Sequence, residues 1–284
     1  MAVDVLSALV RGLSFLALFQ AAGVAMFLAL FGRRLAETSR PVRRLGLVSA
    51  LAAIVFVAVH YALEAARMAG AFSGVLDPML QGLVFDSPMS TAGIWRMLGL
   101  ALIAATIGRQ GTASTVIGLI GAGAVIAAFL FVGHSAIHPD RAWLSMLLAI
   151  HLAVVAFWFG SLLPLYAVSR AERPAVAAEI VNDFSRVAIW SVPAILLVGV
   201  VMAVLLIDRW ATFREGYGLS LLAKIIGFAA LMALAALNKW RYGPALAEAS
   251  GAAAAFRRTA AVEYVLICVV LMTTAVMTTL FSPE

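Results

Sequence analysis

The chain has 284 residues, of which 64% are hydrophobic and 12% are charged, and its formal net charge is +6. Because soluble domains carry roughly a quarter charged residues, this composition excludes an ordinary soluble protein and indicates repeated membrane crossings. The positive charge is divided among separate loops, whereas a nucleic-acid-binding surface needs one basic patch, so we expect no nucleic-acid partner.

Eight apolar runs approach the length of about 20 residues that a membrane-crossing helix needs. In chain order they cover residues 5–31, 45–69, 93–108, 114–133, 143–168, 184–207, 219–240 and 256–281. None alternates strictly between apolar and polar residues, as the strands of a membrane barrel do. The sequence therefore predicts an all-α, polytopic membrane helix bundle of about eight transmembrane helices, with residues 1–284 forming one integral-membrane domain.

Basic residues gather in every second loop of this arrangement, which the positive-inside rule assigns to the cytoplasm. These loops hold Arg33, Arg34, Arg40, Arg43, Arg44, Arg109, Arg170, Arg173, Arg186, Lys239, Arg241, Arg257 and Arg258. Both chain termini are then expected on the outer, periplasmic side. The longest outer segment, residues 70–92, is moderately apolar, and part of it is expected to lie on the membrane surface as a short helix.

Ionisable side chains inside membrane helices are costly and mark functional candidates. His60 lies nine residues before the end of the second run, and His151 lies eight residues into the fifth. At 1.5 Å per residue, both are roughly 12–13 Å below the outer surface. His134 and His138, in the stretch GHSAIHP, follow the fourth run at its outer end. All four histidines of the chain are thus expected on one side of the membrane.

This placement predicts a copper site in the outer half of the bundle. Imidazole and thioether ligands together favour Cu(I), whereas a carboxylate favours harder ions such as Cu(II). The candidate ligands are His60, His134, His138, His151, Glu64, Met97 and Met146. Alternatives remain open for each: a membrane methionine that only packs, a hydrogen-bonded His60–Glu64 pair, a histidine that caps a helix, or a solvated loop histidine.

Four further residues are candidates for a pathway or exit toward the cytoplasm. Trp158 lies two turns below His151, and Lys224 lies about 8 Å below the outer end of its helix. Asn238 and Glu263 lie near the cytoplasmic ends of the seventh and eighth runs. Glu263 is an exit-side ligand or proton acceptor in one interpretation, and forms a structural ion pair with the nearby Arg257 and Arg258 in the other.

Several short motifs occur in a characteristic order. GHSA at residues 133–136 is followed by His151 and then by WFGSL at residues 158–162, a pattern of H-x6-W-x-G-x-L. Later come LLAK at 221–224, ALNK at 236–239, and an arginine pair at 257–258 before Glu263. Over roughly residues 114–283, the chain resembles the CopD family of bacterial copper-resistance membrane proteins.

The resemblance implies a multi-pass protein of the bacterial inner membrane that moves copper between periplasm and cytoplasm, usually by uptake. It also implies a small periplasmic copper-binding partner of the CopC type. His60 and His138 have no assigned counterpart in the family pattern, so their candidacy depends on the residues alone. No nucleotide-binding motif is present in the sequence, so transport is expected to be passive or driven by a gradient.

Two other functions fit the same residues. His60 and His151, at equal depth on different helices, suit the axial positions of a b-type haem in a membrane redox protein. Alternatively, three histidines and a carboxylate suit a copper-holding assembly factor or a membrane enzyme with an open metal position. The favoured hypothesis, copper transport, requires no enzymatic activity.

Overall fold

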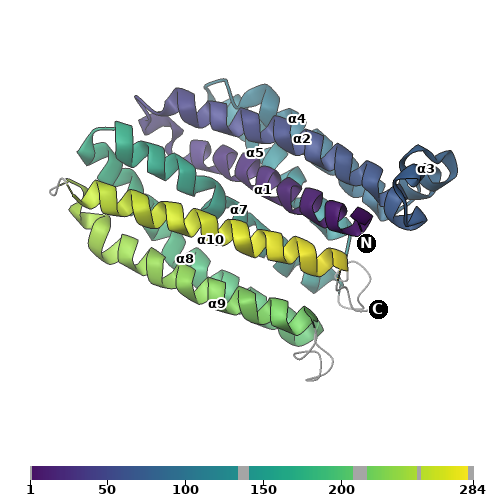
Figure 1. Ribbon diagram of the computed structural model, residues 1–284. Coiled ribbons are helices and arrows are strands. Elements are labelled where there is room, and N and C mark those ends of the chain that lie inside the picture. Colours follow the sequence, from purple (N-terminus) through teal and green to yellow (C-terminus); the bar gives the residue numbers. More distant parts are fainter. Residues whose placement is uncertain (1, 134–140, 207–215, 248–250, 281–284) are drawn as a thin grey trace.

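The computed structural model describes residues 2–133, 141–206, 216–247 and 251–280. Throughout these ranges the regular structure is helical, without strands. The long helices are α1 (Ala2–Phe31), α2 (Ser39–Ala69), α4 (Pro88–Thr106), α5 (Thr112–Ala127), α7 (Arg141–Ala171), α8 (Pro174–Leu206), α9 (Gly216–Leu237) and α10 (Ala252–Leu280). Figure 1 shows them aligned along one bundle axis, so the predicted all-α bundle is confirmed.

Seven of the described helices are long and apolar enough to cross a membrane. They match seven of the eight apolar runs, and the remaining run, residues 219–240, corresponds to α9, a helix of 22 residues. At 1.5 Å per residue, α9 is about 33 Å long, which is close to the thickness of the bilayer core.

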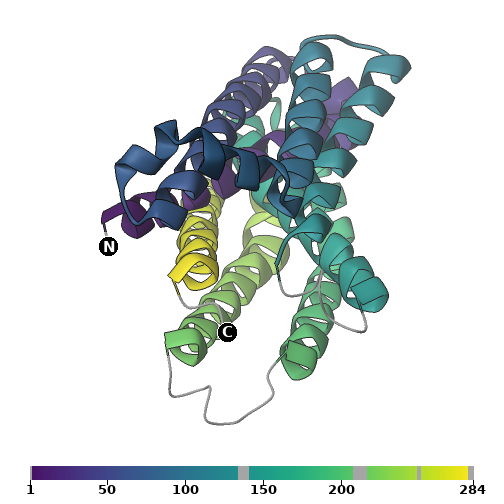
Figure 2. The ribbon, with the colours of Figure 1, turned by 90° about the vertical axis from the view of Figure 1, so that its right-hand side faces the viewer.

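The short α3 helix (Pro78–Phe85) lies at the end of the bundle where α1 begins and α10 ends (Figures 1 and 2). The sequence explains its start, because the Asp77 side chain accepts hydrogen bonds from the backbone of Met79 and Leu80, and Pro78 takes the first helical position. Ser87 and Pro88 repeat this pattern at the start of α4. The chain thus begins and ends on the same side of the bundle, although the membrane side of that end stays a prediction.

Helix α1 is the centre of the bundle, and it packs against α2, α5, α7 and α10. Its crossing with α7 is close because Gly23 and Gly160 face each other there. A Cβ atom added to Gly23 would lie 1.9 Å from the backbone oxygen of Ala156, and one added to Gly160 would lie 2.5 Å from the Cα of Gly23. Small residues that allow helix backbones to touch are typical of membrane interfaces. The Gln20 side chain adds a buried hydrogen bond of 3.1 Å to the Gly160 carbonyl.

At the opposite end from the termini, polar side chains hold the helix ends together. Glu172 accepts hydrogen bonds from the backbone N–H groups of Glu37 and Thr38 and from the Thr38 hydroxyl, at 2.7–3.0 Å. A carboxylate at this position satisfies the free N–H groups before α2 and interacts well with the helix dipole. Arg34 forms an ion pair of 2.6 Å with Asp183 on α8.

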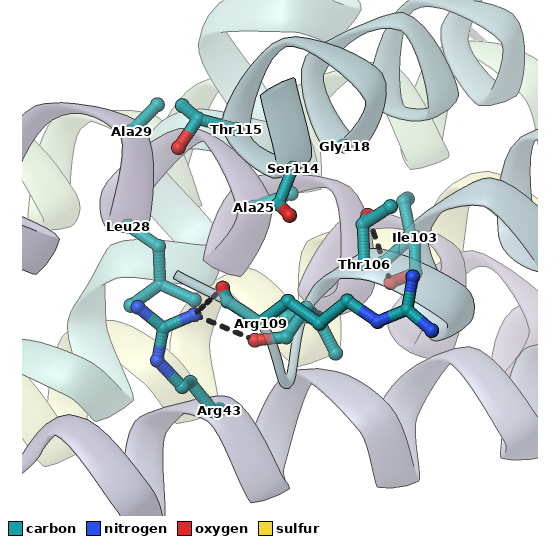
Figure 3. Close-up of a pocket in the computed structure, with 11 residues that line it drawn as sticks. Ala25, Leu28, Ala29, Arg43, Ile103, Thr106, Arg109, Ser114, Thr115 and Gly118 are labelled. Atoms are coloured by element: carbon teal, nitrogen blue, oxygen red, sulfur yellow. Dashed lines mark hydrogen bonds between the residues drawn. The ribbon is translucent and has the colours of Figure 1, made fainter. Parts of the chain in front are cut away.

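Arg43 secures the turn between α4 and α5 in a similar way. Its guanidinium donates to the carbonyls of Ile107 and Arg109 at 2.8 and 2.7 Å, which neutralises the negative end of α4 (Figure 3). The adjoining pocket between α1, α2, α4 and α5 has a volume of about 30 Å³. A cavity measured in this way needs roughly 10–15 Å³ to hold one water molecule, so this pocket has room for water. No predicted site residue lines it.

Candidate functional site

His60 on α2 faces the inside of the bundle, where its side chain is only 7% exposed. Neither ring nitrogen has a hydrogen-bond partner among the residues that the structure describes. Buried polar groups normally have a hydrogen-bond partner, so a ligand, a water molecule or an ion is expected to contact this imidazole. In the neutral ring one nitrogen carries a hydrogen and the other a lone pair, so either nitrogen, but only one at a time, could bind a metal ion.

Glu64 lies one turn further along α2 but is engaged elsewhere. Both of its carboxylate oxygens accept hydrogen bonds of 3.1 Å from Arg67. Arg67 also donates to the Thr279 carbonyl at 3.3 Å and lies 3.8 Å from Asp4. The structure therefore places Glu64 in an ion pair with Arg67, and its role as a copper ligand stays a prediction.

The other predicted outer ligands are more scattered. His151 is partly exposed on α7, Met97 on α4 packs against the main core, and Met146 is 46% exposed on α7. His134 and His138 lie outside the described residues. Over the described ranges, no group of three or more His, Cys, Asp or Glu side chains converges in a way that could hold a metal ion. A complete copper site at His60 would therefore need ligands beyond this set.

Two arginines inside the described membrane helices stack on aromatic rings. Arg11 on α1 stacks over the Phe15 ring at 5.6 Å, and Arg96 on α4 stacks over the Phe129 ring at 4.7 Å. The two rings are 5.4 Å apart. The sequence signal for these residues was a charged side chain within an apolar run.

In the other half of the bundle, three of the four predicted pathway residues meet. The Asn238 amide donates to one carboxylate oxygen of Glu263 at 2.6 Å, and the Trp158 indole N–H donates to the other at 3.4 Å. The Thr259 hydroxyl also bonds to the side-chain oxygen of Asn238. Glu263 is only 2% exposed. Lys224, the fourth predicted residue, lies on α9, and its side chain is outside the described set.

Glu263 thus takes neither nearby arginine as a partner in the described structure. Arg257 instead donates to the Ser169 carbonyl at 3.2 Å, and Arg258 is exposed. We refer to Trp158, Asn238, Thr259 and Glu263 as the inner cluster. It joins α7, α10 and the residue at which α9 gives way to a π-helical turn.

That turn, Asn238–Tyr242, begins directly after α9. The Gly243 N–H donates to the Asn238 carbonyl at 2.7 Å, closing the wider loop of a π turn. Turns of this kind are rare and are often found at functional sites. Here the turn presents the Asn238 side chain toward Glu263 while its backbone carbonyl is used by Gly243.

Comparison with known proteins places these features in a family. A family model described as "Copper resistance protein D-like, N-terminal domain" matches residues 1–146, and one described as "Copper resistance protein D" matches residues 178–277. A protein of Pseudomonas syringae pv. tomato, named Copper resistance protein D, is 28% identical over 264 residues, which is 87% of this chain and 85% of the relative. No solved structure matches the chain. The match to the amino-terminal model extends the relationship well beyond residues 114–283, where the motifs had placed it. The chain is therefore a multi-pass membrane protein that belongs to the copper resistance protein D family.

Proposed function

We propose that this protein transports copper across the bacterial inner membrane, from the periplasm to the cytoplasm. The observation that carries this proposal is the buried His60 imidazole, whose two ring nitrogens have no hydrogen-bond partner among the described residues. Family membership supplies the choice of copper. A free imidazole nitrogen is a good ligand for either oxidation state of copper, and methionine thioethers would favour Cu(I).

In this proposal, copper is captured from the periplasmic side by His134, His138 and the outer methionines, and then passes to His60 and His151. A small periplasmic copper-binding protein of the CopC type delivers the ion. The four histidines need not bind copper at the same time. Sites with only a few ligands each suit the transfer of a copper ion along a transport route, because a complete and rigid set of ligands would bind the ion too tightly to release it.

The inner cluster serves as the gate on the cytoplasmic side of this route. Glu263 is held by donors from two other elements, α7 and the π turn, so its two hydrogen bonds join three parts of the bundle. An approaching cation would compete with the Trp158 and Asn238 donors for the same carboxylate oxygens. Binding of the ion would then release the two elements, and the gate would open toward the cytoplasm.

The test is copper uptake by the purified protein in liposomes, compared with His60→Ala. We expect this substitution to lower the initial rate at least tenfold, because it removes the buried ligand. Val59→Ala is the matched control, since Val59 is the adjacent residue of α2 and its side chain is exposed on the surface of the bundle. Equal rates for His60→Ala and the control would contradict the proposed route.

Two further measurements on the same samples separate the alternatives. Sidedness is read by adding copper to vesicles in which the orientation of the protein has been determined, and outward movement alone would refute the proposed direction. An absorption spectrum that shows a Soret band lost in His60→Ala would favour the haem-binding hypothesis. Tight copper binding without transport would favour a copper-holding assembly factor.

A further inference from the structure

The Glu263 carboxyl is buried well inside the membrane-spanning part of α10. It lies eleven residues after Ala252, about 16–17 Å along a helix about 43 Å long. The bilayer core is about 30 Å thick, so this position is within the core and not at its surface. The side chain is only 2% exposed. An ionised carboxylate in such a place is strongly disfavoured unless a positive charge lies beside it.

The titratable groups on α10 itself do not pair with this carboxyl. Arg257 donates to a backbone carbonyl of α7, and Arg258 is exposed. Tyr264 stacks on an aromatic ring of α7, with 4.7 Å between the ring centroids. Cys268, one turn beyond Tyr264, is half-buried. The helix that carries Glu263 therefore supplies no counter-charge for it.

The neighbouring elements supply none either. Helix α10 packs against α1, α7, α9 and residues 238–247. The basic side chains of these elements are Arg170, Lys239 and Arg241 toward the end nearer the inner cluster, and Arg11, Arg141, His151 and Lys224 toward the other end. In the part of the chain that the structure describes, only Trp158 and Asn238 come within hydrogen-bond or ion-pair distance of the Glu263 carboxyl. Both of these donors are neutral.

Asn238 connects Glu263 to a short chain of hydrogen-bonding groups. Its amide nitrogen lies 2.6 Å from one carboxylate oxygen, and its oxygen contacts the Thr259 hydroxyl. That hydroxyl also lies 2.9 Å from the Phe256 carbonyl and 3.2 Å from the Ala255 carbonyl. A hydroxyl can donate and accept, and a side-chain amide can turn over to exchange its nitrogen and oxygen. The chain of hydrogen bonds can therefore run in either direction.

The two directions match the two charge states of Glu263. When the carboxyl is ionised, the Thr259 hydroxyl donates to the Asn238 oxygen, and the Asn238 nitrogen donates to the carboxylate. When the carboxyl holds a proton, its O–H donates to the turned Asn238 oxygen, the Asn238 nitrogen donates to Thr259, and the Thr259 hydroxyl donates to the Phe256 carbonyl. Every polar group in the chain has a partner in both states, so neither state leaves a buried group unsatisfied.

We propose that Glu263 is a reversible proton-binding site, which holds a proton in the absence of copper and releases it when the ion arrives. The coupling to copper rests on the proposed function. As copper forms a bond to a carboxylate oxygen, the O–H bond breaks and the proton passes to water. Exchange of one proton for one Cu(I) leaves the net charge of the inner cluster unchanged, so no uncompensated charge is buried. Protonation itself does not depend on copper.

The proton site is tested on copper-free protein in liposomes by infrared difference spectroscopy. At neutral pH the wild type should show the carbonyl stretch of a protonated carboxylic acid, and Glu263→Gln should lack it. Glu179→Gln is the matched control, because Glu179 is an exposed carboxylate of α8, and it should keep the band. Identical spectra for Glu263→Gln and the wild type would overturn the assignment.

A second variant tests the role of Asn238. Asn238→Leu removes the shorter of the two hydrogen bonds to Glu263. Because a hydrogen bond to an ionised acceptor is stronger than one between neutral groups, the ionised state loses more, and the band should persist to higher pH than in the wild type. A band that disappears at the same pH in folded Asn238→Leu would refute the proposed chain.

The coupling is measured with a pH indicator as copper is added to the same samples. The wild type should release one proton more per bound copper than Glu263→Gln does. Equal proton release by the two proteins would refute the exchange. Failure of the wild type to transport copper, with the infrared band present, would refute the proposed function and support the proton site alone.

Discussion

The contact between α1 and α7 predicts a large effect from the smallest possible change, Gly160→Ala. The added Cβ would lie 2.5 Å from the Cα of Gly23, 2.7 Å from its carbonyl carbon and 2.9 Å from the backbone nitrogen of Val24. Carbon atoms in good contact are about 3.5–4.0 Å apart. Because every one of these neighbours is backbone, no side chain can rotate away, and the two helices must separate by about 1 Å.

The energetic cost has two parts. Overpacking of a well-packed interface typically costs about 1–3 kcal/mol. Separation of the helices also weakens the buried hydrogen bond from Gln20 to the Gly160 carbonyl, and a hydrogen bond of this kind contributes about 0.5–1.5 kcal/mol. We therefore expect Gly160→Ala to lower the free energy of unfolding by roughly 2–4 kcal/mol.

The measurement uses the single cysteine of the chain. Cys268 is half-buried on α10, so a thiol-reactive dye reports unfolding in detergent as the temperature rises. Gly123→Ala is the control, because Gly123 lies on the exposed side of α5 with nothing within 4 Å of the added atom. We expect the midpoint to fall by several degrees for Gly160→Ala, on the scale of about 2–4 °C per kcal/mol. Equal midpoints for the two variants would refute the close-crossing argument.

Two further substitutions test the polar contacts. Glu172→Gln should destabilise the protein by about 1 kcal/mol, because a neutral amide interacts more weakly with the Thr38 N–H and with the dipole of α2. The same thermal assay checks this prediction, and Glu179→Gln is the control because Glu179 is exposed. Glu263→Ala should lower the free energy of unfolding by about 1–3 kcal/mol, because the buried Asn238 amide loses its acceptor. It should also raise the leakage of copper across the membrane of liposomes that contain the protein. A variant with unchanged stability and no increase in leakage would argue against a gate at this position.

The sequence alone predicted the elements of the fold well, because the length and polarity of an apolar run nearly determine a membrane helix. A charged residue such as Arg96 lowers the apolar character of the run at residues 93–108, and apolar character is what identifies a transmembrane segment. In the structure α4 is nevertheless continuous from Pro88 to Thr106, with Arg96 buried against Phe129. The favourable cation–π contact offsets part of the cost of burying the Arg96 charge. The sequence pattern does not reveal this contact, because the partner comes from another helix.

The candidate sites were less predictable, because they depend on which helices are neighbours. Glu64 has His60 four residues before it and Arg67 three residues after it, and both spacings allow a contact. Only the structure shows that Glu64 forms its hydrogen bonds with Arg67. Likewise, Trp158 and Glu263 are 105 residues apart in the chain, and their hydrogen bond arises from the packing of α7 on α10. The motifs identified these residues without indicating that they touch.

The central position of α1 has a consequence for biogenesis. Two of the groups that pair with polar side chains of α1 lie far along the chain. The Gly160 carbonyl accepts from Gln20, and the Thr278 carbonyl accepts from Arg11 across 267 residues of sequence. Contacts of such long range are slow to form, because the chain loses conformational entropy before the stabilising contact is made. Arg11 gains these acceptors, the Thr278 carbonyl and the Thr279 hydroxyl, only when α10 packs against α1. The packing of α10 against α1 is therefore expected to be a slow step in the assembly of the bundle, after α1 has packed against α2.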